Sequence, residues 1–514
     1  MLEKRNLQGL LLVVTLLSVF VTGVLQEVKA NDELKKTPEE VIRYQEVFFH
    51  FYRKDEYQAL VNLTAGLKDK NIIANKFANE LLLGNLYLMY GLPDLAEKSL
   101  KLVAEQSGAK KQKVLALFYL AKKHFDNAEY VEFLSLISKI NKDLPSGLNL
   151  EKDYMLGMSF INQGRYQFAE EILDDMDSGS DWYEYLAFNL GATYLKLGEN
   201  DQGEKLLERI GKKSFESEDM LSLKDKSNIV LGYYYIRAGK SKNAISVLES
   251  VRLDGPFSNK ALLGLGWAYS QQERYRDALV PWLALAEKDE LDVTVQEAKL
   301  ASAFAYRQLG GEIKAMKLYK DAINKYSGVR KYFNDEVSTS FTRNVFSPLL
   351  KTYRTDDYGV TLGIQRELKE GKGIILVDLL EEETFQKMFN DYRDLKQLQH
   401  KLTIWRQDLK RMDVALSLKE AEKRVDEASV NRFTSYDGLN NKELLLTLSD
   451  TVQLQNDRME ILLGMYEEKI RDEFVRALNT KQQYLIAYLS QARFALAEIL
   501  DSAQKKEAKS IGDE

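Results

Sequence analysis

The chain has 514 residues, of which 45% are apolar and 29% charged, so wholesale disorder is excluded and about two to four domains are allowed. It contains only six prolines, which favours long helices over an architecture of sheets and turns. The net charge of −6 is spread along the chain, which gives no electrostatic reason to expect a nucleic-acid partner.

The N-terminus has the pattern of a cleavable secretory signal peptide over residues 1–30. Lys4 and Arg5 precede an apolar run of 16 residues, and Val28 and Ala30 fit the −3 and −1 positions of a cleavage site. A run of this length is short for crossing ~30 Å of hydrocarbon, which favours cleavage. An uncleaved membrane anchor is the alternative.

The sequence contains no cysteine. An exported protein of this kind is held together by its core without disulfides, and it has no residue to acylate as a lipoprotein. We therefore expect a bacterial periplasmic protein, with at most a peripheral association with the membrane.

Six stretches share one spacing of small, aromatic and large apolar residues. The six units are Gly84, Tyr87, Gly91, Ala96, Leu100; Gly157, Phe160, Gly164, Ala169, Leu173; Gly191, Tyr194, Gly198, Gly203, Leu207; Gly232, Tyr235, Gly239, Ala244, Leu248; Gly266, Tyr269, Glu273, Ala278, Trp282; and Ala303, Tyr306, Gly310, Ala315, Tyr319. From the second unit onward, successive units start 34, 41, 34 and 37 residues apart. The wider gap after the first unit has room for a degenerate unit at residues 115–140, and a hairpin at residues 38–68 begins the array.

This spacing, with a period near 34 residues, resembles the tetratricopeptide repeat. The resemblance covers about residues 38–327 and implies an α-solenoid in which each unit is a pair of antiparallel helices. The small residues at the eighth and twentieth positions of a unit are then expected where its helices approach most closely. The glycine at the fifteenth position is expected to end the first helix in a left-handed conformation.

The resemblance also implies which residues form the concave wall of the solenoid, namely the second, fifth, ninth, twelfth and thirteenth positions of each first helix. The candidate partner-binding residues obtained in this way are Tyr154, Met158, Phe188, Lys196, Tyr233, Arg237, Trp267, Phe304 and Arg307. Rigid aromatic side chains with a few cations are suited to binding a peptide or a helix. Alternatively, these aromatic residues pack on their neighbours or beneath the chain's own C-terminal region.

The repeated spacing of small and aromatic residues ends after residue 328. Residues 329–384 have a mixed pattern, and we expect them to form a connecting region. Apolar residues at heptad spacing follow from residue 385 to the C-terminus. One seam is Leu398, Leu402, Trp405, Leu409, Met412 and Leu416; the second, in a helix expected over residues 441–504, is Leu445, Leu448, Val452, Met459, Leu462, Tyr466, Ile470, Tyr484 and Tyr488. An antiparallel helical hairpin is the economical fold for this arm, residues 385–514. Pairing between two chains through residues 385–504 would give a homodimer instead.

No constellation of catalytic or metal-binding residues stands out in the sequence. The three histidines, His50, His124 and His400, lie in different segments without a second ligand at helical spacing. Helical superhelices occur in periplasmic lytic transglycosylases, but nothing in this chain resembles their catalytic domain. The sequence therefore predicts a protein that is not an enzyme, requires no cofactor or metal and takes no small-molecule substrate.

Together these patterns predict an all-α fold: a solenoid of about 7–8 helical hairpins over residues 31–328, followed by a long C-terminal helical hairpin or coiled coil. The predicted function is that of a periplasmic scaffold whose groove binds a peptide or helix of another envelope protein. Such a scaffold would help to assemble an envelope complex, for example energy-transducing, secretion or motility machinery. The alternative is a periplasmic chaperone or assembly factor for outer-membrane proteins or exopolysaccharide.

Overall fold

The described part of the protein is helical. The computed structural model describes residues 38–53, 55–68, 76–140, 144–338, 379, 383–427 and 437–512. These ranges contain helices and no strand, which confirms the predicted all-α fold. None of their helices is both long and apolar enough to cross a membrane. The predicted signal peptide and most of the predicted connecting region lie outside the described residues.

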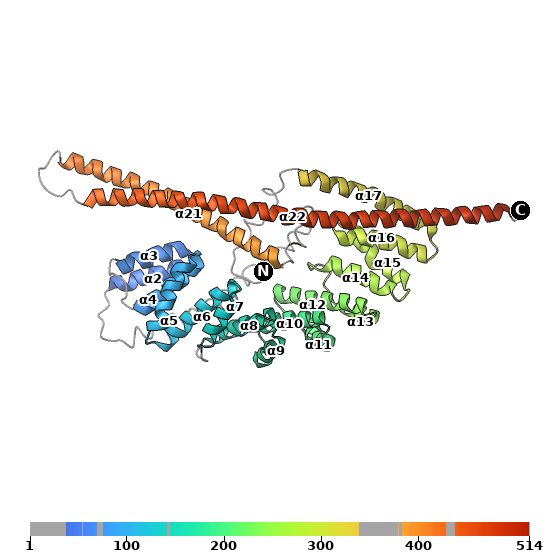
Figure 1. Cartoon of the computed structure of the whole chain (residues 1–514), viewed down its shortest axis with the longest axis horizontal. Coiled ribbons are helices and arrows are strands. Elements are labelled where there is room, and N and C mark those ends of the chain that lie inside the picture. Colours follow the sequence, from blue (N-terminus) through green and yellow to red (C-terminus); the bar gives the residue numbers. More distant parts are fainter. Residues whose placement is uncertain are drawn as a thin grey trace. The chain divides into compact units, whose positions relative to one another are not determined.

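Up to residue 338, the described helices pair in chain order into eight hairpins (Figure 1). The hairpins are α2 (Pro38–Tyr52) with α3 (Glu56–Lys68), α4 (Lys76–Tyr90) with α5 (Pro93–Gln106), α6 (Lys110–Asp126) with α7 (Tyr130–Ile137), α8 (Ser146–Asn162) with α9 (Tyr166–Asp175), α10 (Asp181–Leu197) with α11 (Asn200–Lys212), α12 (Glu218–Arg237) with α13 (Ser241–Leu248), α14 (Ser258–Ser270) with α15 (Tyr275–Ala286), and α16 (Val293–Gln308) with α17 (Glu312–Ser338). The first is the hairpin predicted at residues 38–68, and α6 with α7 is the predicted degenerate unit.

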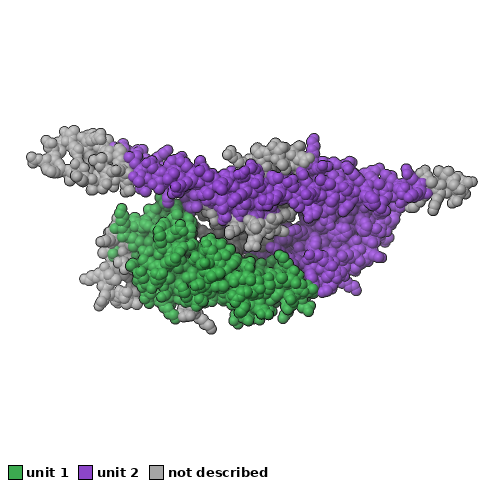
Figure 2. Space-filling view, in the orientation of Figure 1, with its two compact units in different colours: residues 1–210 green, residues 211–514 purple. Residues whose placement is uncertain are grey.

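The chain divides into two compact units, residues 1–210 and residues 211–514 (Figure 2). Unit 1 holds helices α2 to α10 and nearly all of α11. Unit 2 holds helices α12 to α17 together with two long helices, α21 (Glu383–Glu427) and α22 (Asp437–Gly512). The division falls inside the repeat array, between the fifth and the sixth hairpin.

The small residues at the eighth position lie where the two helices of a hairpin touch. A Cβ atom at Gly84 would come within 2.6 Å of Leu100, and one at Gly232 within 2.4 Å of Leu248. In both hairpins the blocking residue is the large apolar one that ends the repeated spacing. At Gly157 the close approach is instead to Leu186 of α10, in the following hairpin, at 2.5 Å. In most units the repeated pattern therefore encodes a glycine on the first helix against a large side chain on the second.

The fifteenth position of the units adopts the left-handed conformation that the sequence predicts. The five glycines at this position have φ values from 70° to 90°, and they are Gly91, Gly164, Gly198, Gly239 and Gly310. Two residues with side chains take the same conformation, Ala128 in the degenerate unit and Glu273 in the fifth unit, each at φ 59°. Every turn of this type therefore reverses the chain in the same way, whether or not glycine is present.

Replacing Glu273 with glycine is expected to stabilise the protein. A left-handed conformation costs a residue with a side chain about 1–2 kcal/mol, and glycine avoids most of this cost. Because glycine also gains freedom in the unfolded chain, we expect a net gain of ~0.5–1 kcal/mol in the free energy of unfolding. Urea unfolding followed by circular dichroism measures it. A loss of stability in Glu273→Gly would show that the Glu273 side chain contributes more than its backbone conformation costs.

The long helix α22 has two partners. Over its first part it pairs with α21 in an antiparallel hairpin, as the sequence predicts for the arm. The Tyr392 hydroxyl donates to Glu467 Oε1 at 2.7 Å, and the Tyr466 hydroxyl donates to Asp391 Oδ2 at 3.1 Å. These two hydrogen bonds join α21 and α22 within one chain.

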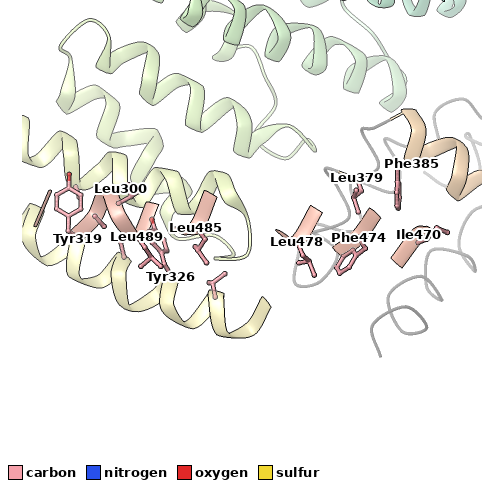
Figure 3. Close-up of a cluster of buried hydrophobic side chains, with 14 of the residues drawn as sticks. Leu300, Tyr319, Tyr326, Leu379, Phe385, Ile470, Phe474, Leu478, Leu485 and Leu489 are labelled. Atoms are coloured by element: carbon pink, nitrogen blue, oxygen red, sulfur yellow. The ribbon is translucent and has the colours of Figure 1, made fainter. Parts of the chain in front are cut away.

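Over its second part α22 packs on the last hairpin of the array. It lies mainly on α17 and to a lesser extent on α16, just as α16 lies on α15 and α14. Leu485 and Leu489 of α22 join Leu300 and Tyr319 in one buried cluster (Figure 3). This segment of α22 therefore occupies the place that the first helix of a further repeat would take.

The predicted seam of α22 is correct in part. Val452, Met459, Tyr466, Ile470 and Tyr488 are buried or half-buried, and Leu445 is half-buried. Three predicted seam residues are instead exposed, namely Leu448 at 42%, Leu462 at 42% and Tyr484 at 52%, and so is Met412 of α21 at 53%.

The reason for the difference is the register of the buried face of α22. Steps of four residues from Ile470 to Phe474 and from Phe474 to Leu478 shift the register, and buried residues then recur every seven positions from Leu478 to Leu485 and onward. An insertion of four residues of this kind interrupts a heptad pattern locally. Tyr484, which lies two heptads after Ile470, therefore falls outside the buried face. The helix also begins at Asp437, ahead of the expected start at residue 441.

Candidate partner-binding groove

In unit 1, the predicted wall residues lie on α8 and α10. The Tyr154 ring lies 4.9 Å from the Trp182 ring, measured between centroids, and burial raises the pKa of Tyr154 to about 12. Phe188 is buried and Met158 is half-buried. Lys196 is exposed near the end of α10.

In unit 2, Tyr233 and Phe304 also pack on neighbouring helices. The Tyr233 hydroxyl donates to the Lys260 carbonyl oxygen at 3.0 Å, and burial raises its pKa. The Phe304 ring meets the Tyr275 ring edge-on, with centroids 6.0 Å apart. Arg237 is exposed at the last turn of α12.

Trp267, on α14, contacts the following repeat. Its indole Nε1–H donates to Glu297 Oε1 on α16 at 2.7 Å, and its ring lies 5.0 Å from the Trp282 ring at an interplanar angle of 74°. The Trp267 indole is half-buried, and its N–H group is hydrogen-bonded within the protein. Trp267 therefore links two successive repeats along the concave wall.

The C-terminal helix α22 covers the wall of the last repeat. The Tyr488 hydroxyl donates to Glu297 Oε2 at 2.8 Å, and Arg307 Nη1 forms an ion pair with Glu498 Oε2 at 2.6 Å. Glu297 and Arg307 occupy the second and twelfth positions of the sixth unit, and the fifth position, Leu300, is buried beneath the same helix. At this repeat the wall residues therefore lie beneath the chain's own C-terminal region, which is the alternative to an open binding groove.

Burial of Tyr488 against Glu297 also changes the pKa of the tyrosine hydroxyl. Burial, followed by the nearby Glu297 carboxylate, raises the pKa of the Tyr488 hydroxyl. The hydroxyl is therefore held neutral and able to donate its hydrogen bond. Glu297 accepts from Trp267 and Tyr488 with its two oxygens, so a single carboxylate joins α14, α16 and α22.

Glu297, Tyr488 and Glu498 are the residues that sequence reasoning missed at this site. Glu297 stands at a wall position, the second of its unit, so a complete transfer of the wall positions includes it. Tyr488 was predicted as a seam residue of the arm, and the structure instead places it against the solenoid. Glu498 carried no signal, because its partner Arg307 lies 191 residues away in the chain.

Two of the three histidines, His50 and His124, lie at hairpin turns, and His400 is exposed in the middle of α21. His50 lies 3.3 Å from Asp55 between α2 and α3, and His124 lies 2.5 Å from Glu129 between α6 and α7, measured between Nδ1 and a carboxylate oxygen. Within the described ranges, no three acidic or histidine side chains come close enough to one another to hold a metal ion.

No protein-family model matches the chain, and no curated protein matches it. Among solved structures, one of MamA is 25% identical, and the match covers 35% of this chain and 97% of that one with a TM-score of 0.27. A Cut9–Hcn1 structure of the APC/C is 13% identical, with 90% of this chain and 97% of that one covered and a TM-score of 0.26. The P58(IPK) TPR domain is 19% identical, with 74% and 97% covered and a TM-score of 0.18.

TM-scores of this size do not establish a common overall arrangement. The tetratricopeptide assignment therefore rests on geometry within this chain. Its supports are the eight helical hairpins, the glycines at the closest approach of the two helices, and the left-handed turns at the fifteenth position. The chain is a helical-repeat protein of the tetratricopeptide type.

Proposed function

We propose that this helical-repeat protein is a non-catalytic periplasmic scaffold whose concave wall binds a peptide or helix of another envelope protein. The observation that carries the proposal is the set of residues that form the wall in the repeats before the last one. Aromatic side chains there are held by packing, as with Tyr154 and Tyr233. Exposed cations stand on the wall helices α10 and α12, namely Lys196 and Arg237. Rigid aromatic surface with cations at its edge is typical of sites that bind acidic or amphipathic segments.

The exposed cations provide the sharpest test, because changing them leaves the packing intact. A variant with Lys196→Glu and Arg237→Glu is expected to lose a partner that the unaltered protein recovers from envelope extract, since both substitutions reverse charge on the wall. If the protein is a scaffold, we also expect it to be recovered with one partner in fixed stoichiometry. Quantitative mass spectrometry of the recovered complex measures this stoichiometry.

The matched control reverses two exposed cations on second helices, Lys205→Glu on α11 and Arg276→Glu on α15. It has the same net charge as the test variant and is expected to keep the partner. Unchanged recovery with the wall variant would overturn the groove as the binding surface. Recovery of many unfolded proteins in variable amounts would support the chaperone alternative instead.

A further inference from the structure

The outer face of α22, where it packs on the solenoid, is depleted of charge. Between residues 481 and 500, all of which the structure describes, the exposed residues are Gln483, Tyr484, Ile486, Ala487, Ser490, Gln491, Arg493, Phe494, Ala497 and Leu500. Arg493 is the one charged residue among these ten, although 29% of the chain is charged. Phe494 is 66% exposed, and Ile486 and Leu500 are each 45% exposed. Loss of charge around exposed apolar side chains is the composition of an interface centre.

This face continues an interface that the protein already builds. In unit 2, α14 packs between α13 and α15, and α16 packs between α15 and α17. The segment of α22 packs on α17 and α16 in the same manner, and its opposite side is the exposed face just described. The array therefore ends with one helix that is covered on one side only, at the place where a further helix would stack.

The exposed residues fit a second copy of the same face in the antiparallel direction. About a two-fold axis between positions 493 and 494, Ser490 lies opposite Ala497 and Ala487 lies opposite Leu500. Ser490 of one copy and Ala497 of the other, both small, then lie opposite each other near the centre of the contact. Farther from the centre, Leu500 of one copy fills the space beside Ala487 of the other. At the axis, Arg493 of each copy faces the Phe494 ring of the other, which is a favourable cation–π arrangement. In an isologous interface both chains contribute the same residues to the contact, and this pairing meets that requirement.

From these observations we infer that two copies of this chain form a symmetric dimer through the outer face of α22 between Gln483 and Leu500. Of the seam residues predicted for the arm, Val452 and Ile470 are buried within the chain, whereas Tyr484 is exposed and belongs to the proposed face. The dimer joins two copies at the C-terminal end of the repeat array. This inference does not depend on the proposed groove function.

Sedimentation equilibrium of the purified chain over a dilution series tests the dimer. We expect twice the chain mass at high concentration, and Phe494→Glu is expected to raise the dissociation constant roughly 30-fold or more, as for loss of an aromatic hot spot. The matched control is Ile461→Glu, which changes an equally exposed residue of the same helix, 66% in both cases, outside the proposed face. Circular dichroism checks that both variants fold.

Cross-linking tests the register, and it benefits from the absence of native cysteines. Arg493→Cys lies at the two-fold axis and is expected to form a disulfide-linked dimer on mild oxidation. Asn479→Cys is exposed on the same side of α22 but distant from its symmetry mate, and it is expected to form no disulfide between the two copies. A monomer at every concentration, a dimer that survives Phe494→Glu, or equal loss with Ile461→Glu would each overturn the inference. Linkage through Asn479→Cys would overturn the antiparallel register.

Discussion

Replacing Trp282 with alanine is expected to lower the free energy of unfolding of unit 2 by about 3–5 kcal/mol. Trp282 is fully buried between α14 and α15, the helices of the seventh hairpin, and its Nε1–H donates to the Leu263 carbonyl oxygen at 3.2 Å. The ring also fills the space above Gly266, where an added Cβ would come within 2.1 Å of it. Alanine leaves a cavity and removes the hydrogen bond. Urea unfolding followed by tryptophan fluorescence and circular dichroism measures the loss.

The control for this prediction is Val280→Ala on the same helix. Val280 is 70% exposed, so its truncation is expected to change the free energy of unfolding by less than about 0.5 kcal/mol. If Trp282→Ala cost no more than the control, the hairpin would not depend on the contact that the repeat pattern encodes. The repeated glycine and large apolar residue would then need another explanation.

Removing Arg252 is expected to destabilise the sixth hairpin by about 3–5 kcal/mol at neutral pH, because it leaves a buried carboxylate without its cation. Asp225 is 1% exposed, and Arg252 Nε donates to its Oδ2 at 2.7 Å while the Arg252 backbone N–H donates to Oδ1 at 3.2 Å. Burial raises the pKa of Asp225 even with Arg252 present. In Arg252→Ala the pKa is expected to rise further.

The sign of the pH dependence follows from that raised pKa. A carboxyl group whose pKa is higher in the folded than in the unfolded protein binds its proton more readily when folded, so its contribution to stability improves as the pH falls. The loss in Arg252→Ala is therefore expected to shrink as the pH falls from 7 towards the unfolded value of about 3.9. Urea unfolding at a series of pH values measures the difference between the variant and the unaltered protein.

A double variant separates charge from packing. Adding Asp225→Asn to Arg252→Ala removes the buried charge and is expected to recover much of the loss at pH 7. A loss that is independent of pH and unaffected by Asp225→Asn would mean that the packing of the Arg252 stem, and not the charge of Asp225, supports the hairpin.

Much of the repeat array could be predicted from the sequence because its contacts are local. Gly232 and Leu248 belong to one hairpin and recur in kind at Gly84 and Leu100, so spacing alone identifies them. The left-handed turn at Gly239 is likewise a property of a few adjacent residues. The degenerate unit could be located only from the gap between neighbouring units, since Ala128 stands where most of the other turns have glycine.

The parts that sequence reasoning missed depend on contacts between distant segments. The hydrogen bond from Tyr488 to Glu297 and the ion pair of Arg307 with Glu498 each join residues 191 positions apart, and no periodicity reports such a contact. For the same reason Leu462 and Tyr484 were placed on the seam of α22. A heptad pattern describes a helix with one partner, whereas this helix has two.

The continuity of α22 has a mechanical consequence. Its 76 residues span roughly 114 Å at about 1.5 Å per residue, and the same uninterrupted helix belongs to the arm and to the end of the solenoid. No hinge separates these two regions of contact, so the helix acts as a rigid lever. A pull or twist applied to the arm is transmitted directly to the hairpin of α16 and α17, which lets the last repeat respond to load carried far along the molecule.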